Sequence, residues 1–107
     1  MCPAGYTPPV YEVFKSATFD KGFDGLKDRQ AKARIVVRID RLSLGNAGDA
    51  KPVGSGVSEM RINYRPGYRV YYIQRGPIVM LLLCGGDKRT QAADIRRAVE
   101  IAEQWSG

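Results

Sequence analysis

The chain has 107 residues, of which 17 are Lys or Arg and 11 are Asp or Glu, so its formal net charge is +6, and it contains no His. This length suits one domain with one core, and a hydrophobic fraction of 44% is ordinary for a globular protein. Without His, His-based catalysis is excluded and two Cys leave no plausible zinc site, whereas the positive charge favours a polyanionic partner such as a nucleic acid.

Residues 1–9 are rich in Pro and Gly and are expected to form an irregular lead-in rather than a helix. They lack the basic and then apolar order of a signal peptide. No stretch of the chain approaches the length of an apolar membrane span. The expected location is therefore the cytoplasm, with no membrane contact.

Bulky residues in Val10–Phe14 predict a first strand. Ser16 or Thr18 can then cap a helix that continues to about Asp28. A second helix is predicted from about Arg29, because apolar residues recur there at spacings of three and four, with basic residues on the other side. The two segments predict a helical hairpin packed on a sheet. Small residues and Gly in 46–56 then predict a loop.

A β-hairpin follows this loop. From Val57 to Tyr64 apolar and polar residues alternate, as in a strand with one buried face. A three-residue loop at 65–67 pairs Tyr64 with Tyr68 and keeps the apolar faces of the two strands together, whereas a two-residue loop would mix them. We therefore predict the register set by the three-residue loop.

The polar face of this hairpin carries two arginines. In the predicted register Arg61 is opposite Tyr71 and Arg69 is opposite Asn63, so the two guanidinium groups are diagonal neighbours. We expect this face to be exposed to solvent and both groups to reach one phosphate. Arg61 could instead pair with Glu59, but nothing acidic is predicted opposite Arg69. The pattern favours phosphate binding and, with the net charge, RNA.

The run Ile78–Cys84 has no polar interruption, which predicts a central strand covered on both faces, with Cys84 as a small buried residue. Asp87 or Thr90 can cap a last helix whose apolar stripe extends to Trp105. The order of elements predicts an α+β fold in one domain: a small, mostly antiparallel four-stranded sheet with an N-terminal helical hairpin and a C-terminal helix. Its first strand is placed beside the central apolar strand.

Two linked segments carry a resemblance to a known family. They read K-P-V-G-S-G-V-S-E-M-R-I-N-Y-R-P-G-Y-R-V-Y-Y and L-L-L-C-G-G-D-K-R-T-Q-A-A-D-I-R-R-A. With them the chain resembles, over Tyr11–Ala102, the RelE/ParE toxin superfamily, and within it the HigB-like branch of addiction module killer proteins. The resemblance implies a toxin of a type II toxin-antitoxin system, most often an endoribonuclease that cuts mRNA on the ribosome with no metal or cofactor.

In such enzymes the 2′-hydroxyl of RNA attacks the adjacent phosphate. By the resemblance, Arg69 matches the phosphate-binding arginine, Arg61 matches a basic residue on the neighbouring strand, and Lys88 matches the basic residue after the last strand, which can protonate the leaving group. Asn63 departs from the pattern, because relatives place a basic residue there that serves as the base. Asp94 stands where relatives place Tyr or another polar group; it could act as the base or only favour a helix N-terminus.

Further candidates for RNA contact are Lys51, Arg65, Tyr71 and Arg89. Lys51 could equally be a solvated loop lysine, and Tyr71 either stacks on a base or merely covers the sheet. Arg89 could only add to the positive field.

The implied partners are a cognate antitoxin, commonly a helix-turn-helix DNA-binding protein in this branch, and the ribosome with its mRNA. Two other functions stay open. One is a ParE-like toxin that poisons gyrase without nuclease activity, against which the cluster of basic residues argues. The other is a catalytically inactive module that binds the antitoxin, which the neutral Asn63 and the lack of His favour.

Overall fold

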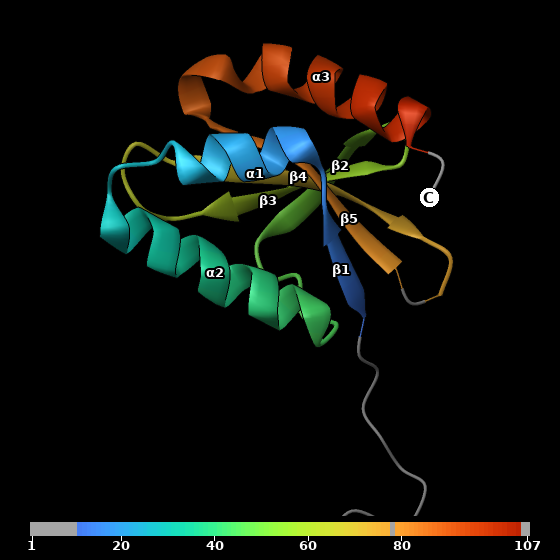
Figure 1. Ribbon diagram of the computed structural model, residues 1–107, viewed down its shortest axis with the longest axis horizontal. Helices are drawn as coiled ribbons and strands as arrows, with labels where there is room; N and C mark the ends of the chain where they lie inside the picture. Colours follow the sequence, from blue (N-terminus) through green and yellow to red (C-terminus); the bar gives the residue numbers. More distant parts are fainter. Residues whose placement is uncertain (1–10, 78, 106–107) are drawn as a thin grey trace, which may run out of the picture.

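A five-stranded sheet lies between two helical layers in the computed structural model, which describes residues 11–77 and 79–105 (Figure 1). The described elements are, in order, β1 (Glu12–Lys15), α1 (Ala17–Asp24), α2 (Arg29–Ser43), β2 (Ala50–Gly54), β3 (Val57–Ile62), β4 (Tyr68–Arg75), β5 (Val79–Asp87), the short 3₁₀ helix η1 (Lys88–Thr90) and α3 (Gln91–Gln104). The expected lead-in, residues 1–9, lies outside the described residues.

The strands are arranged in the order β1-β5-β4-β3-β2. Strand β1 is parallel to β5 and the other neighbours are antiparallel. The predicted α+β class, the mostly antiparallel sheet and the place of the first strand beside the apolar run are therefore confirmed.

The predicted number of strands is wrong, because β2 lies within the segment 46–56 that was expected to be a loop. Ser55 and Gly56 both have positive φ, which is the backbone conformation of a two-residue turn between antiparallel strands. The Gly-rich composition thus serves a turn at the end of a short strand, and β2 pairs with β3 along the edge of the sheet.

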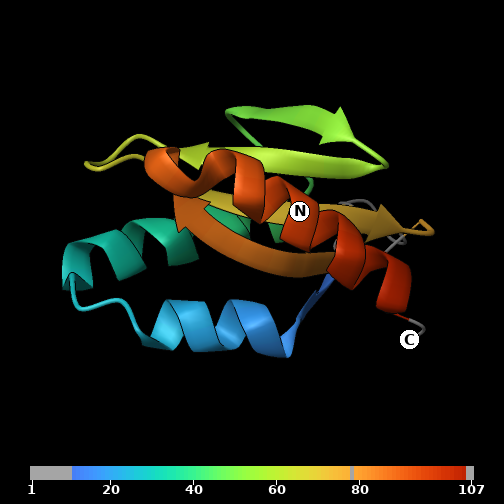
Figure 2. The same cartoon turned by 90° about the horizontal axis from the view of Figure 1, so that it is seen from above.

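The sheet separates two hydrophobic clusters. Helices α1 and α2 pack on one face, where Ile35 and Leu42 meet Val70 and Leu82. Helix α3 crosses the strands on the other face, as Figure 2 shows, and its Ala98 packs in a cluster with other strand residues. Strand β5 contributes to both clusters, which confirms that the apolar run is covered on its two faces. Cys84 is buried there as predicted, and burial raises the pKa of its thiol to about 12.

The helix boundaries follow from their capping residues. Ser16 caps α1, because its Oγ accepts a hydrogen bond from the backbone N–H of Phe19 at 3.0 Å. Asp28 caps α2 by accepting from the N–H groups of Gln30 and Ala31 at 2.9 and 3.2 Å. Since Asp28 has this role, the first helix ends at Asp24 rather than near Asp28. The predicted start of the second helix at Arg29 is confirmed.

The predicted register of the β3–β4 hairpin is wrong by two residues. Ile62 pairs with Tyr68 and Arg61 pairs with Arg69, so residues 63–67 form the connection. Tyr64 leaves the strand because its ring packs under the Arg34 guanidinium, 4.8 Å from its centroid, and its hydroxyl lies 3.0 Å from an oxygen of Asp28. A shift of two residues keeps every side chain on its predicted face of the sheet.

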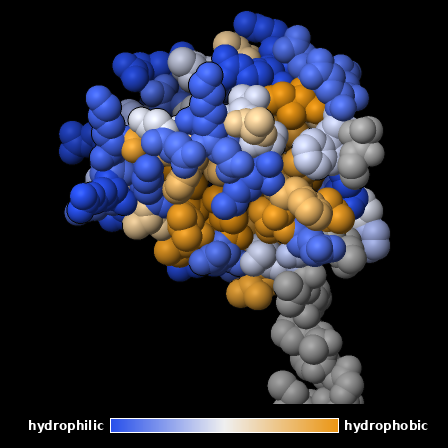
Figure 3. Space-filling model, viewed as in Figure 1, coloured by the Kyte–Doolittle hydropathy of each residue, from blue (hydrophilic) through white to orange (hydrophobic). Residues whose placement is uncertain are grey.

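Hydrophobic side chains also lie on the surface. The exposed large hydrophobic residues of the described chain are Phe14, Val36, Val37 and Leu44. Figure 3 shows hydrophobic surface over part of α2 and beside β1, with hydrophilic side chains around it. Within the described residues, the helices are all too short or too polar to span a membrane.

Two glycines provide a test of this packing. A Cβ on Gly86 would lie 1.8 Å from Oδ2 of Asp94, whereas a Cβ on Gly22, within α1, would meet no atom within 4 Å. We expect Gly86→Ala to lower the free energy of unfolding by about 1–3 kcal/mol through overpacking. Gly22→Ala should raise it by about 0.5–1 kcal/mol, because Ala favours the helix. Denaturant unfolding followed by circular dichroism measures both, and equal stability of the two variants would contradict this packing.

Candidate functional site

Arg61 and Arg69 lie directly opposite each other on β3 and β4. Their side chains are on the face of the sheet that α3 covers, and they are 38% and 12% exposed. The structure therefore brings the two predicted arginines together, and closer than the diagonal arrangement that was expected. The expectation that this face is open to solvent is wrong, because α3 packs over it and buries Glu59 and Tyr71.

A buried carboxylate joins the two arginines. Glu59 has no solvent exposure, and its Oε1 lies 3.2 Å from Nε of Arg61 while its Oε2 lies 3.3 Å from Nε of Arg69. The expectation that no acid faces Arg69 is thus wrong. Glu59 precedes Arg61 by two residues on the same strand, so both side chains point to the same side of the sheet. Under α3 that side is an interior, where a carboxylate needs charged or hydrogen-bonding partners.

Two further groups donate to Glu59. The hydroxyl of Tyr71 lies 3.0 Å and Nε2 of Gln91, from α3, lies 2.7 Å from Oε2. Burial raises the pKa of Glu59. The hydrogen bonds from Gln91, Arg61 and Tyr71 and the charge of Arg69 together lower this pKa by more than burial raises it, so the net pKa is below its ordinary value. Glu59 is therefore ionised at neutral pH. Two guanidinium charges share one carboxylate charge, and one positive charge remains in excess.

The guanidinium of Arg69 is incompletely satisfied by the described residues. Its Nε is buried and, although close to Glu59, makes no hydrogen bond of acceptable geometry. Its Nη1 donates to the carbonyl of Gly67 at 3.4 Å, a long and weak bond. A guanidinium has five N–H donors and no acceptor. Most of the donors of this largely buried cation are consequently free for an anion with several oxygens.

The predicted RNA contact of Tyr71 is contradicted. Tyr71 is fully buried beneath α3 and its hydroxyl donates to Glu59, so its ring cannot stack on a base at the surface. Burial, with the negative charges of Glu59 and Asp94, raises the pKa of this hydroxyl. Tyr71 therefore orients the carboxylate that holds the arginines.

The carboxylate of Asp94 is buried and does not lie at the surface, where a base for a bound RNA would be needed. It is 5% exposed, lies in the first turn of α3, and accepts a hydrogen bond from the hydroxyl of Thr90. Its carboxylate also fills the space beside Gly86. The position agrees with the alternative reading, in which an acidic residue favours a helix N-terminus.

The remaining candidates are exposed. Lys51 lies on β2 rather than in a loop. It is opposite Glu59 on the neighbouring strand β3, so its side chain is on the same face of the sheet as Arg61. Lys88 lies in η1, directly after β5, and Arg65 lies in the 63–67 connection.

Arg89 forms an ion pair with Asp87 at 3.0 Å. The same carboxylate accepts from the backbone N–H of Arg89 at 2.8 Å and caps η1, rather than α3. The side chain and backbone of Arg89 hold the pKa of Asp87 below its usual range.

Sequence reasoning offered Glu59 only as an alternative partner of Arg61, which the structure confirms, and it missed the contacts of Glu59 with Arg69 and Gln91. A signal for Glu59 was present, because an apolar strand covered on both faces requires a helix on the side of the sheet that carries Glu59. The contact of Gln91 depends on how α3 is placed over the strands, which no local pattern specifies.

Comparison with known proteins adds one relative. No protein-family model matches the chain. The chain is 44% identical over 93 residues to a protein of Haemophilus influenzae named "Uncharacterized protein", and the matched region covers 87% of this chain and 94% of that one. The two chains belong to one family. The printed name of the relative states no activity, so the function has to be argued from the site.

The role of Glu59 can be tested through pH. Its pKa is lower in the folded chain than the ordinary 4.5, so its ionised form stabilises the fold above about pH 4.5, and this stabilisation is lost as the pH falls through the lowered pKa. We expect Glu59→Gln to lower the free energy of unfolding by about 3 kcal/mol at pH 7, because the largely buried cation Arg69 and the partly exposed Arg61 lose their counter-charge.

The loss should shrink as the pH falls below about 4.5, where wild-type Glu59 becomes protonated as well. Denaturant unfolding between neutral and acidic pH measures this difference. Glu103→Gln, at an exposed position of α3, is the matched control and should change little. A loss of the same size at every pH would show that the charge of Glu59 is not what stabilises the site.

Proposed function

We propose that Arg61 and Arg69 bind a phosphodiester of single-stranded RNA and that the protein is a RelE/ParE-like toxin of a type II toxin-antitoxin system that cuts mRNA on the ribosome. The observation that carries this proposal is the Arg69 guanidinium, which is only 12% exposed and whose donors are largely without partners in the described residues. A buried cation of this kind is stabilised when an anion accepts from it.

The geometry of Glu59 supports phosphate binding. It contacts each arginine through Nε, the nitrogen nearest the backbone. The terminal nitrogens of both groups therefore point beyond the carboxylate, where a phosphate oxygen can accept from them. Because the Arg69 side chain is only 12% exposed, an ionic hydrogen bond there is screened less by water than it would be at an open surface.

The fold and the sequence segments support the toxin assignment. The α+β order, with two N-terminal helices, a mostly antiparallel sheet and a C-terminal helix, is consistent with a RelE-like domain. The segments that carry the resemblance correspond to β2–β4 and to β5 with the start of α3, and these elements build the arginine pair and its buried partners.

The proposed reaction needs no redox chemistry. The 2′-oxygen forms a bond to phosphorus as its proton passes to water or to a group of the ribosome, and the bond from phosphorus to the 5′-oxygen breaks as that oxygen gains a proton. Arg61 and Arg69 stabilise the charge that develops on the phosphoryl oxygens. Lys88, exposed directly after β5, supplies a proton or a positive charge to the leaving oxygen.

A second candidate function follows from the position of the acids. Glu59 is ion-paired and buried, Asp94 is buried against Gly86, and Asn63 cannot accept the proton. Among the described residues, these candidates leave the arginine pair without an exposed carboxylate that could serve as the base. This favours, as the alternative, a module that binds RNA or an antitoxin and does not cut RNA.

RNA binding provides the first test. We expect Arg69→Ala to weaken binding of a labelled single-stranded RNA about tenfold or more. The slope of log affinity against log salt concentration should fall by about one, the amount expected when one phosphate contact is lost. Fluorescence anisotropy over a series of salt concentrations measures both. Arg96→Ala removes the same charge from an exposed position of α3 and should change affinity only slightly. Equal losses in the two variants would mean that only net charge matters.

Induction in a bacterial host provides the second test. We expect brief expression of the wild type to arrest growth and to create new 5′ ends within translated regions of mRNA, and Arg69→Ala to do neither, because the phosphate is no longer held. Mapping of transcript 5′ ends measures cleavage, with circular dichroism to confirm that the variant is folded.

The other functions give different results in the same experiment. RNA or antitoxin binding without new 5′ ends would establish the binding module. DNA damage with intact mRNA would establish a gyrase poison instead.

A further inference from the structure

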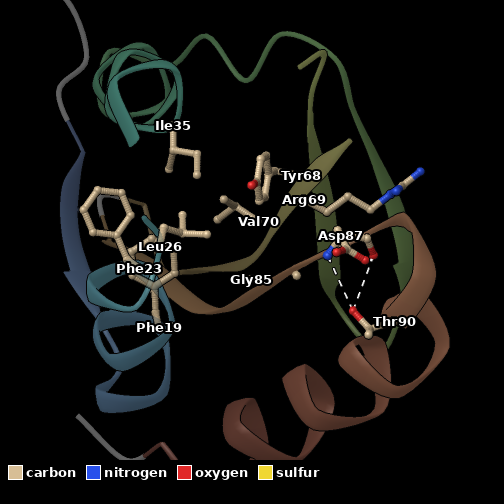
Figure 4. A pocket seen from close by; sticks show the side chains of 12 residues that line it. Phe19, Phe23, Leu26, Ile35, Tyr68, Arg69, Val70, Gly85, Asp87 and Thr90 are labelled. Atoms are coloured by element: carbon tan, nitrogen blue, oxygen red, sulfur yellow. Dashed lines mark hydrogen bonds between the residues drawn. The ribbon is translucent and has the colours of Figure 1, made fainter. Parts of the chain in front are cut away.

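A partly open cavity of about 180 Å³ lies between the two N-terminal helices and the ends of β4 and β5. Its apolar wall consists of Phe19, Phe23, Leu26, Ile35, Tyr68 and Val70. Figure 4 shows these side chains around the space, with Asp87 and Thr90 at its polar side. The cavity is on the opposite side of the sheet from the Glu59 cluster, but both are formed at the same end of β4.

The space is retained although the helix could fill it. Gly22 lines the cavity from within α1, and a Cβ there would meet no atom within 4 Å. Glycine within a helix costs about 0.5–1 kcal/mol relative to alanine. Gly85 and Gly86 also line the cavity, but close contacts with Arg69 O, at 3.1 Å, and with Asp94 explain them. No neighbouring atom requires a glycine at this exposed position of α1, and an occupant of the cavity would give it a packing role.

The size and walls of the cavity suit one planar ring. A cavity of about 150 Å³ lined by Leu, Ile and Phe is known to bind benzene. Aromatic side chains are also the usual partners of nucleic acid bases, because each base has a face that stacks. The wall here combines both features, with Phe19 and Phe23 from α1 and Tyr68 from β4 among its aliphatic residues.

The charged residues that line the cavity are Asp87 and Arg69, and two further cations, Lys88 and Arg89, follow Asp87 in the chain. Asp87 is already paired with Arg89 and caps η1. Lys88 follows Asp87 and is exposed. It lies close to Gly67, because a Cβ added to Gly67 would be 3.9 Å from the Cβ of Lys88. A ring that carries an anionic group therefore fits this opening better than a neutral ring does.

Arg69 connects the cavity with the arginine pair. It borders the cavity between Tyr68 and Val70, and Figure 4 shows its side chain directed away from the apolar wall. Its guanidinium lies with Glu59 on the other side of the sheet. Since β4 begins at Tyr68, a nucleotide chain has only the end of the sheet, at Gly67 and Lys88, to pass between the two places.

We propose that this cavity holds the base of a nucleotide whose neighbouring phosphate is bound by Arg61 and Arg69. The inference rests on the proposed function, because it takes RNA as the ligand of the arginine pair. Lys88 contacts the backbone where the RNA passes over the end of the sheet. The cavity thereby fixes which linkage of the RNA reaches the arginines.

The direct test uses mononucleotides and methyl NMR. In the wild type, adenosine, cytidine, guanosine or uridine 5′-monophosphate should shift the methyl signals of Leu26, Ile35 and Val70, because a bound ring lies against them. Ribose 5-phosphate, which has no base, should not shift them. If none of the four nucleotides moves these signals, the inference is overturned.

A filled cavity gives the second measurement. Gly22→Leu places a side chain in the open space, so the shifts should disappear and affinity for single-stranded RNA should fall about tenfold, the usual size of one stacked base. Ala17→Leu adds a leucine at an exposed position of the same helix and should leave both unchanged. Circular dichroism confirms that each variant is folded.

The two proposals fail in different ways. Suppose that Arg69→Ala weakens RNA binding, that Gly22→Leu does not, and that nucleotides cause no methyl shifts. This result overturns the base-binding cavity and leaves the proposed function intact. Methyl shifts that Gly22→Leu abolishes support the cavity. If RNA binding is nevertheless indifferent to Arg69→Ala, the proposed arginine site fails.

Discussion

The arrangement at one end of the sheet depends on the ionised carboxylate of Glu59. It is fully buried, and it is held there by hydrogen bonds from Arg61 of β3, Tyr71 of β4 and Gln91 of α3 and by the charge of Arg69. A buried charge without such partners would cost several kcal/mol, so these elements must stay in register around it. The same carboxylate fixes the two arginines and the position of α3 over the strands.

Local patterns were sufficient to predict most elements, because each has a local physical cause. Alternation defines β3, and Asp28 supplies the cap that starts α2. The errors arose where tertiary contacts decide. Tyr64 leaves β3 to pack on α2, which moves the hairpin register by two residues. The positive φ of Ser55 and Gly56 turns an expected loop into a hairpin with a fifth strand.

The sequence was sufficient to predict which arginines form the candidate site, but not which residues surround them or how deeply they are buried. Alternation correctly placed Arg61 and Arg69 on one side of the hairpin, since side chains of a strand have a period of two. It could not show that α3 covers that side. For this reason Tyr71, a candidate for stacking on a base, and Asp94, a candidate base or helix-terminus acid, are both buried, and Glu59 joins both arginines. Burial is a property of how distant elements pack, and a single strand does not encode it.

Burial of the acids also decides what the site can do. An exposed carboxylate beside Arg69 would repel a phosphate, whereas Glu59 beneath the guanidiniums orients them and Asp94 is buried in the first turn of α3. The phosphate therefore meets mainly donors, which favours binding. The same burial withdraws both carboxylates from the 2′-hydroxyl of a bound RNA. Under the proposed function, phosphate binding and an internal base therefore oppose each other, and the proton would have to leave by water or through a group of the ribosome.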